Sequence, residues 1–261
     1  MKHILYTLGK RYPQIYLPIE EGISNSEEYE KVCYECEEPK RELLFSFNEK
    51  DKLETINTEC GDVDILTLYD RNDFEHIIRS LAFKCEPKDI PKSTGAMALF
   101  GLNNIEKFKA GLDNYKDSFL ILSSGDYSNV NTQSISNVTN NEVTLSQDEW
   151  TEKSITIRKY HELTHFIMRK TYPDNIDPVR DEIIADSIGL MLAFKKLDVR
   201  ILKLFLGLEG ETYRKGGRLE NYKGGDDIEK TLLLIDKITN VLKKYETEEI
   251  NNIWQHIKEI L

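Results

Sequence analysis

The chain has 261 residues, a formal net charge of −11 from 46 acidic and 35 basic residues, and a pI of about 5.1. With 39% hydrophobic and 31% charged residues, its composition is that of a folded globular protein. The acidic balance argues against a basic nucleic-acid surface and a polybasic membrane anchor, and no apolar run approaches the roughly 18 residues of a membrane span. We therefore expect no nucleic-acid partner and no membrane partner.

The amino terminus and the cysteines favour a cytoplasmic location. Residues 1–10 contain no apolar segment long enough for a signal peptide. Four cysteines in a long chain without an export signal are expected to be reduced thiols. Only Cys33 and Cys36 are close in sequence, whereas Cys60 and Cys85 stand alone, so a Cys₄ zinc site and a redox pair are alternatives to scattered thiols.

The first half is predicted to combine short strands with one helix. Apolar and β-branched clusters predict strands over Ile4–Leu8, Gln14–Ile19, Leu43–Phe47, Asp64–Leu68 and Ser118–Leu122. Helical spacing predicts a helix over Phe74–Phe83, and the polar residues 124–141 are predicted to form a loop. Residues 20–64 carry 15 Asp and Glu against 5 Lys and Arg. We interpret this segment as a solvated surface, with docking to a basic partner as the alternative.

The second half is predicted to be helical. Ser146 and Glu149 have the spacing of a capping box, and a long helix is expected from there to about Lys170. Asp177 and Pro178 are a favourable cap and first-turn pair for a helix that runs to about Lys196. Further helices are predicted over Val199–Leu208, Asp227–Lys244 and Thr247–Leu261. The predicted fold class is α+β, a mixed amino-terminal half and a helical carboxy-terminal half, with an acidic α/β region over residues 1–90 and a second domain over residues 91–261.

The most informative motif is His161-Glu162-Leu163-Thr164-His165, in the first long helix. Two His four residues apart lie about 40° apart around a helix axis, so their imidazoles can converge on one ion. Glu162 lies about 60° from His165 in that projection, where a carboxylate can take a proton from a metal-bound water without being a ligand. Zinc suits imidazole and carboxylate ligands. The alternative is an ordinary amphipathic helix with two incidental His.

A third ligand is expected from the next helix. Glu182 and Asp186 are four residues apart and therefore share a face. Along the helices, His165 lies roughly 10 Å before Tyr172 and Glu182 lies roughly 7.5 Å after Asp177, so both reach a similar depth in an antiparallel hairpin. Glu182 can thus meet the His pair, and Asp186 can hydrogen-bond an imidazole. The alternative is that both acids only favour the positive end of the helix dipole.

Together these motifs resemble the zincin metallopeptidases, in particular the gluzincin branch, in which a His-Glu-x-x-His helix is followed by a Glu on a later helix. Residues 182–186 are similar to that branch's Glu-x-x-x-Asp element, and the match covers residues 161–186. The resemblance implies that His161, His165 and Glu182 bind zinc. It further implies that Glu162 is the general base and that Asp186 orients a ligand His, in the first place His161. Residues 91–261 would then be a zincin-like metallohydrolase domain with an active-site helix pair, and Ser118–Leu122 a strand that pairs with an extended peptide.

Hydrolysis of this kind also needs a donor that stabilises the oxyanion. Residues 213–222 contain glycines beside Arg and Tyr, which is typical of a loop that brings donors to a substrate. Tyr222 and Arg218 are the predicted catalytic donors, with Tyr160 and Tyr172 as alternatives. A plain surface loop is the other interpretation of this segment.

The sequence therefore predicts a cytoplasmic zinc-dependent hydrolase, a metallopeptidase that cleaves peptide or protein substrates by zinc-activated water with Glu162 as base. The peptide as substrate class depends on the resemblance. One alternative is a regulatory or interaction protein that retains the metal site without proteolysis. Another is a non-haem iron site, since two His and one carboxylate also bind Fe(II); Glu162 beside the metal favours hydrolysis over that chemistry.

Overall fold

The computed structural model describes residues 3–35, 37–103, 116–175, 177–209, 212–214, 217–222 and 228–261. In this part of the chain the fold is α+β, as predicted, with a sheet in the amino-terminal half and long helices in the carboxy-terminal half. The chain divides into two compact units, Met1–Asn57 with Gly61–Ser124, and Thr58–Cys60 with Gly125–Leu261. The boundary after Ser124 lies well beyond the one expected at residues 90–91, because two strands after residue 91 belong to the first unit's sheet.

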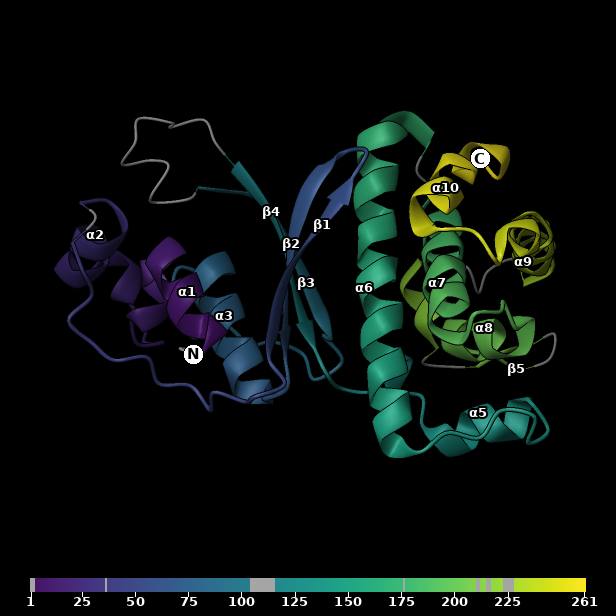
Figure 1. Cartoon of the computed structure of the whole chain (residues 1–261), viewed down its shortest axis with the longest axis horizontal. Coiled ribbons are helices and arrows are strands. Elements are labelled where there is room, and N and C mark those ends of the chain that lie inside the picture. The colour runs from purple at the N-terminus through teal and green to yellow at the C-terminus, as the bar shows by residue number, and fades with distance from the viewer. Residues whose placement is uncertain are drawn as a thin grey trace. The chain divides into compact units, whose positions relative to one another are not determined.

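The first unit is a four-stranded sheet with helices packed on it (Figure 1). The strand order is β1-β2-β4-β3; β2 runs parallel to β4, and β3 runs antiparallel to β4. Residues of α1, α3, β2 and β4 share one apolar core, in which Leu5, Phe74 and Phe119 are fully buried. The elements of this unit are α1 (Ile4–Arg11), α2 (Glu27–Cys33), β1 (Lys52–Thr58), β2 (Gly61–Leu68), α3 (Arg71–Ala82), β3 (Ala96–Asn103) and β4 (Lys116–Ser123).

Three predicted strands of the first unit are wrong. Ile4–Leu8 is helical because Leu5 and Leu8 are both fully buried one turn apart and the His3 side chain accepts a hydrogen bond from the Leu5 N–H. Gln14–Ile19 begins as a 3₁₀ turn that starts at a proline. Leu43–Phe47 has no ladder partners and contributes to the core through its side chains alone.

Strand β4 confirms the predicted buried strand, but its position contradicts the predicted pairing with a substrate peptide. Its residues are hydrogen-bonded to β2 on one side and to β3 on the other. An added peptide strand needs a free edge, and an interior strand has none. The edge strands β1 and β3 are not predicted by the sequence patterns, since the half-buried side chains of an edge strand such as β1 give a weak apolar signal.

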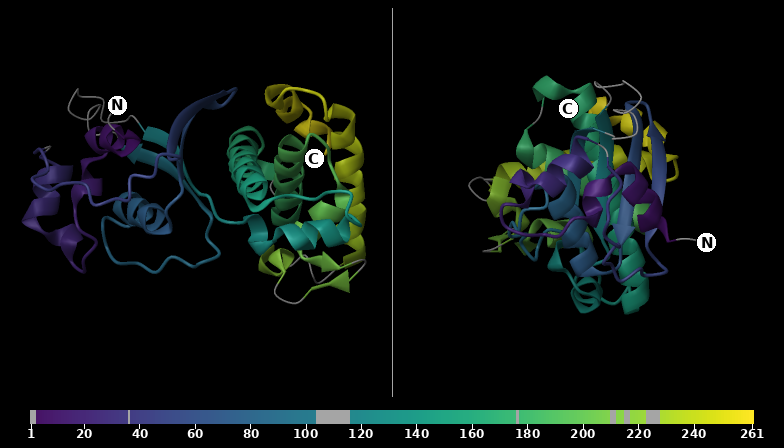
Figure 2. Two further views of the ribbon diagram at one scale, coloured as in Figure 1. Left: turned by 60° about the horizontal axis from the view of Figure 1, so that its bottom comes forward. Right: turned by 90° about the vertical axis from the view of Figure 1, so that its left-hand side faces the viewer.

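The second unit is built from helices, and α7 lies between α6 and α9 (Figures 1 and 2). Helix α6 starts at the predicted capping box, in which the Ser146 side chain accepts from the Glu149 N–H and the Glu149 carboxylate accepts from the Ser146 N–H. Helix α7 starts at the predicted cap, with Asp177 accepting from the Arg180 N–H. The elements are α5 (Thr132–Val138), α6 (Gln147–Thr171), α7 (Pro178–Phe194), α8 (Val199–Leu206), β5 (Leu208–Glu209), β6 (Thr212–Tyr213), α9 (Ile228–Leu242) and α10 (Ile250–Gln255).

Two predictions for this unit are corrected. The predicted loop over residues 124–141 contains α5, whose first turn is capped by the Asn131 side chain. The predicted helix over Thr247–Leu261 is reduced to the short α10 and a following 3₁₀ turn over Ile257–Glu259. No helix in the described ranges combines the length and the apolar character needed to cross a bilayer.

Helices α6 and α7 approach each other closely at Gly189. A Cβ atom added there would lie 2.6 Å from the backbone carbonyl oxygen of Ile157, which cannot rotate away. We expect Gly189→Ala to lower the free energy of unfolding by roughly 1–2 kcal/mol, even though Ala is the better helix former. Urea unfolding measures this change. A higher midpoint for the variant would show that the two helices can separate without cost.

Candidate metal centre

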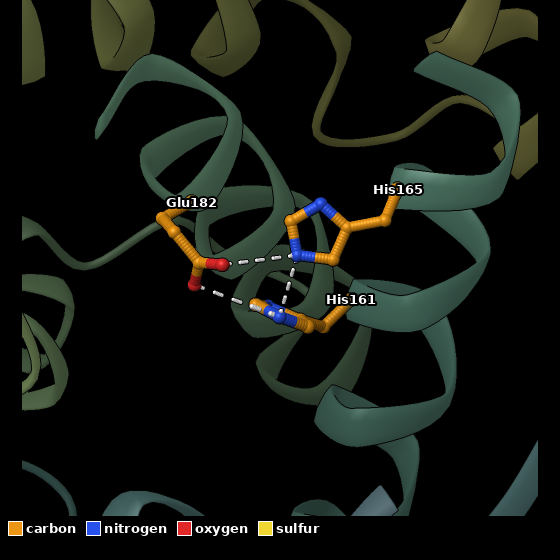
Figure 3. A group of neighbouring side chains, drawn as sticks. All are labelled: His161, His165 and Glu182. Carbon is orange, nitrogen blue, oxygen red and sulfur yellow. Dashed lines mark hydrogen bonds and ion pairs between the residues drawn. The ribbon is translucent and has the colours of Figure 1, made fainter. Parts of the chain in front are cut away.

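Three ionisable side chains meet between α6 and α7 (Figure 3). His161 and His165 come from successive turns of α6, and Glu182 comes from the start of α7. The two His Nε2 atoms are 2.9 Å apart, Glu182 Oε1 lies 3.3 Å from His165 Nε2, and Oε2 lies 3.8 Å from His161 Nε2. A tetrahedral zinc ion with bonds of about 2.0–2.1 Å separates its ligand atoms by about 3.4 Å. The three predicted ligand residues are thus brought together at distances that bracket this separation.

This cluster is buried and distinct. The three side chains are deeply buried, with exposed fractions of 3% for His161 and 7% each for His165 and Glu182. Their ligand atoms all lie within 4.8 Å of one another, and among the described residues no other group of three His, Cys, Asp or Glu side chains meets that condition. A set of acceptors this deeply buried needs a compensating positive charge.

Two carboxylates of α7 hold the outer nitrogens of the imidazoles. Asp186 Oδ1 lies 2.8 Å from His161 Nδ1, as predicted, and Asp181 Oδ2 lies 2.8 Å from His165 Nδ1. Because a carboxylate only accepts, each Nδ1 carries a proton, and each Nε2 faces the other and Glu182, with a lone pair whenever its imidazole is neutral. Asp181 is a site residue that the sequence reasoning missed. The antiparallel pairing of α6 and α7 could have predicted Asp181, because the later His of α6 then lies opposite the earlier acid of α7.

Burial and neighbouring charges shift the pKa values of His165 and Glu182 in opposite directions. Burial alone would lower the pKa of His165, but its hydrogen bonds to Asp181 and Glu182 raise that pKa to about 10. Burial would raise the pKa of Glu182, but the bond to His165 and the charges of His161 and Arg218 hold that pKa well below its usual range. Glu182 Oε2 is buried and receives no hydrogen bond, although it forms an ion pair with Arg218. The positive charges of Arg218 and His165 thus balance the buried carboxylates, which is the role that a divalent ion would take at this site.

Tyr127 joins the outer side of the cluster, and the sequence reasoning missed it. Its hydroxyl lies 2.5 Å from Asp186 Oδ1 and 3.0 Å from His161 Nδ1, and it accepts a hydrogen bond of 2.7 Å from Arg218 Nη1. The side chain is buried, and burial raises the pKa of Tyr127 well above its usual range. No spacing rule connects Tyr127 with the motif, because it comes from the segment that was predicted to be a loop.

Both predicted oxyanion donors lie at this cluster. Arg218 Nη2 is 2.9 Å from His161 Nε2 and 2.8 Å from Glu182 Oε2. Burial and the neighbouring Glu182, to which its hydroxyl is hydrogen-bonded, raise the pKa of Tyr222 to about 12. The 3₁₀ turn Arg218–Tyr222 therefore brings two donors directly to the ligand residues.

A family match covers both units of the chain. The family described as "Family of unknown function (DUF7005)" matches residues 2–112 and 110–260. The chain belongs to the DUF7005 family. Comparison with curated proteins and with solved structures found no match. All three candidate ligands, together with Asp181 and Asp186, lie in the second matched range of DUF7005.

Glu162 of this DUF7005 protein is next to His161 in α6 but is not one of the three clustered residues. Its side chain is half-buried, and its charge acts on Arg158, one turn earlier. Burial lowers the pKa of Arg158 to about 10, against the opposing effects of Tyr127 and Glu162. Arg158 in turn donates a 2.9 Å hydrogen bond to the Gly125 carbonyl oxygen. Glu162 thus directly follows a candidate ligand in α6 and is partly exposed to solvent.

The cysteines that the structure describes are not part of this centre. Cys33, Cys60 and Cys85 are reduced thiols. Cys85 is fully buried, and Cys33 packs against the same apolar cluster. Cys36, on which both the Cys₄ and the redox alternatives depend, lies outside the described residues.

Proposed function

We propose that this DUF7005 protein is a zinc-dependent hydrolase of the gluzincin-like zincin type, a metallopeptidase acting on peptide or protein substrates. One observation carries the proposal: the Nε2 atoms of His161 and His165 converge with the Glu182 carboxylate, while a separate carboxylate holds the Nδ1 atom of each His. We place this activity in the cytoplasm. Docking of residues 20–64 to a basic partner stays a prediction.

The chemistry of each residue gives it a role in the proposed reaction. His161, His165 and Glu182 would hold the ion, and Asp181 and Asp186 keep both Nε2 atoms turned inward. When bound, zinc supplies Lewis acidity that polarises a carbonyl oxygen and lowers the pKa of water to about 7.

We assign both proton transfers of the reaction to Glu162. Its carboxylate takes a proton from the attacking water and returns it to the leaving amine. Arg218 supplies an N–H donor and Tyr222 an O–H donor at the ligand residues, and both are assigned to the developing oxyanion.

The test combines metal content with cleavage. The purified full-length chain should contain about one equivalent of zinc by elemental analysis. It should cleave members of a peptide library, and a chelator should abolish that cleavage until zinc is restored. Iron as the dominant metal would favour the iron-site alternative. A zinc-loaded protein that cleaves no peptide would favour the regulatory or interaction protein.

A further inference from the structure

One nitrogen of Arg218 contacts two of the three candidate ligands. Nη2 donates to His161 Nε2 at 2.9 Å and pairs with Glu182 Oε2 at 2.8 Å. An imidazole that carries its proton on Nδ1 has a single lone pair on Nε2. That lone pair can accept from the guanidinium or bind a metal, but it cannot do both. Arg218 and a metal are therefore mutually exclusive at His161.

The second terminal nitrogen of Arg218, Nη1, is held by partners other than the candidate ligand atoms. Nη1 donates to Asp186 Oδ1 at 3.0 Å and to the Tyr127 hydroxyl at 2.7 Å. The guanidinium can thus withdraw Nη2 while Nη1 keeps its partners.

The backbone just before Arg218 is closely packed. A Cβ atom added to Gly217 would lie 2.9 Å from the Arg214 carbonyl oxygen and 2.9 Å from Gly207 Cα, so only glycine fits this approach. The Tyr213 hydroxyl donates a 2.5 Å hydrogen bond to the Gly217 carbonyl oxygen. These contacts fix the point from which the Arg218 side chain enters the cluster.

We propose that Arg218 is a built-in competitor for the metal, whose Nη2 occupies His161 and Glu182 in the metal-free protein and must leave before an ion can bind. This inference rests on the proposed metal centre and describes its regulation. Once displaced, the guanidinium stays tethered to Asp186 beside the site, where the proposed oxyanion donor is needed. The same side chain would then compete with the metal for His161 and Glu182 and, with the metal bound, donate a hydrogen bond to the oxyanion.

Removal of the competitor should strengthen zinc binding. If the open form is 1–10% of the metal-free protein, the apparent affinity is lowered about 10- to 100-fold, and Arg218→Met should recover that factor. Arg214→Met is the matched control, because Arg214 lies in the same segment with an exposed side chain, and it should bind zinc like the wild type. Competition with a chromophoric chelator measures both affinities.

Kinetics separate displacement from simple charge repulsion. If Arg218 must leave first, the observed rate of zinc binding to the wild type should reach a plateau as zinc concentration rises, and the plateau should vanish in Arg218→Met. Repulsion alone would slow binding without a plateau. Gly217→Ala retains every charge but crowds the backbone that positions Arg218, so it should also strengthen zinc binding. Its zinc affinity tests the proposal if Arg218→Met folds poorly.

The outcomes are distinct. Tighter zinc binding by Arg218→Met with loss of the plateau supports the competitor. Equal or weaker binding by Arg218→Met, with one zinc still bound by the wild type, overturns the competitor and leaves the metal centre intact. A wild type that binds no zinc, or binding that survives replacement of both His161 and His165 by Ala, overturns the metal centre itself.

Discussion

Glu162→Gln is expected to leave zinc binding unchanged and to lower peptide hydrolysis about 10²–10⁴-fold. Glutamine has the same shape as glutamate but cannot take the proton from the attacking water. The side chain is not one of the three clustered residues, so its replacement removes no ligand. Elemental analysis and initial rates on a cleaved library peptide measure the two effects separately.

Glu152→Gln is the matched control, since Glu152 is an exposed acid earlier in the same helix. It should retain the wild-type rate. An active wild type that loses nothing on Glu162→Gln would show that another group accepts the proton. A variant that loses its zinc as well would instead make Glu162 part of the ligand set.

The helix pair could be predicted because its determinants are local. The capping box at Ser146 and the Asp177 cap set the starts of α6 and α7, and a four-residue spacing places two side chains on one helix face. Given an antiparallel hairpin, the rise per residue alone brings Glu182 to the level of His165. The three candidate ligands follow from these rules without any long-range information.

The rest of the site depends on contacts between segments distant in sequence. Tyr127 reaches Asp186 across 59 positions and Arg218 reaches Tyr127 across 91, and no periodicity encodes such pairs. The residues of the turn at Arg218–Tyr222 suggested a substrate donor, but only the structure shows the guanidinium on the ligand atoms themselves.

The errors in the first unit have a related cause. Ile4–Leu8 is a short apolar run that fits a strand or a helix equally well, and tertiary packing selected the helix. The apolar run of β4 showed that the strand is buried but not that it lies inside the sheet, because strand order depends on partners far along the chain.

Glu182→Gln is expected to weaken zinc binding more than any change to the carboxylates behind the His residues. The substitution preserves shape but removes the only anionic group among the three candidate ligands, and a neutral amide is a much poorer zinc ligand than a carboxylate. Asp181→Asn and Asp186→Asn keep an acceptor for each His Nδ1, so their affinities should fall only about 10- to 100-fold. Chelator competition on all three variants gives the ranking.

Asp181→Asn is the sharpest comparison, because Asp181 precedes Glu182 directly and has the same exposed fraction of 5%. Any general damage to the start of α7 would therefore affect both variants alike, and thermal unfolding in chelator would reveal it. Equal zinc affinities for the two variants would remove Glu182 from the ligand set and leave a centre of two His alone. A much larger loss for Glu182→Gln, with unchanged unfolding of the metal-free protein, would identify its carboxylate as the third ligand.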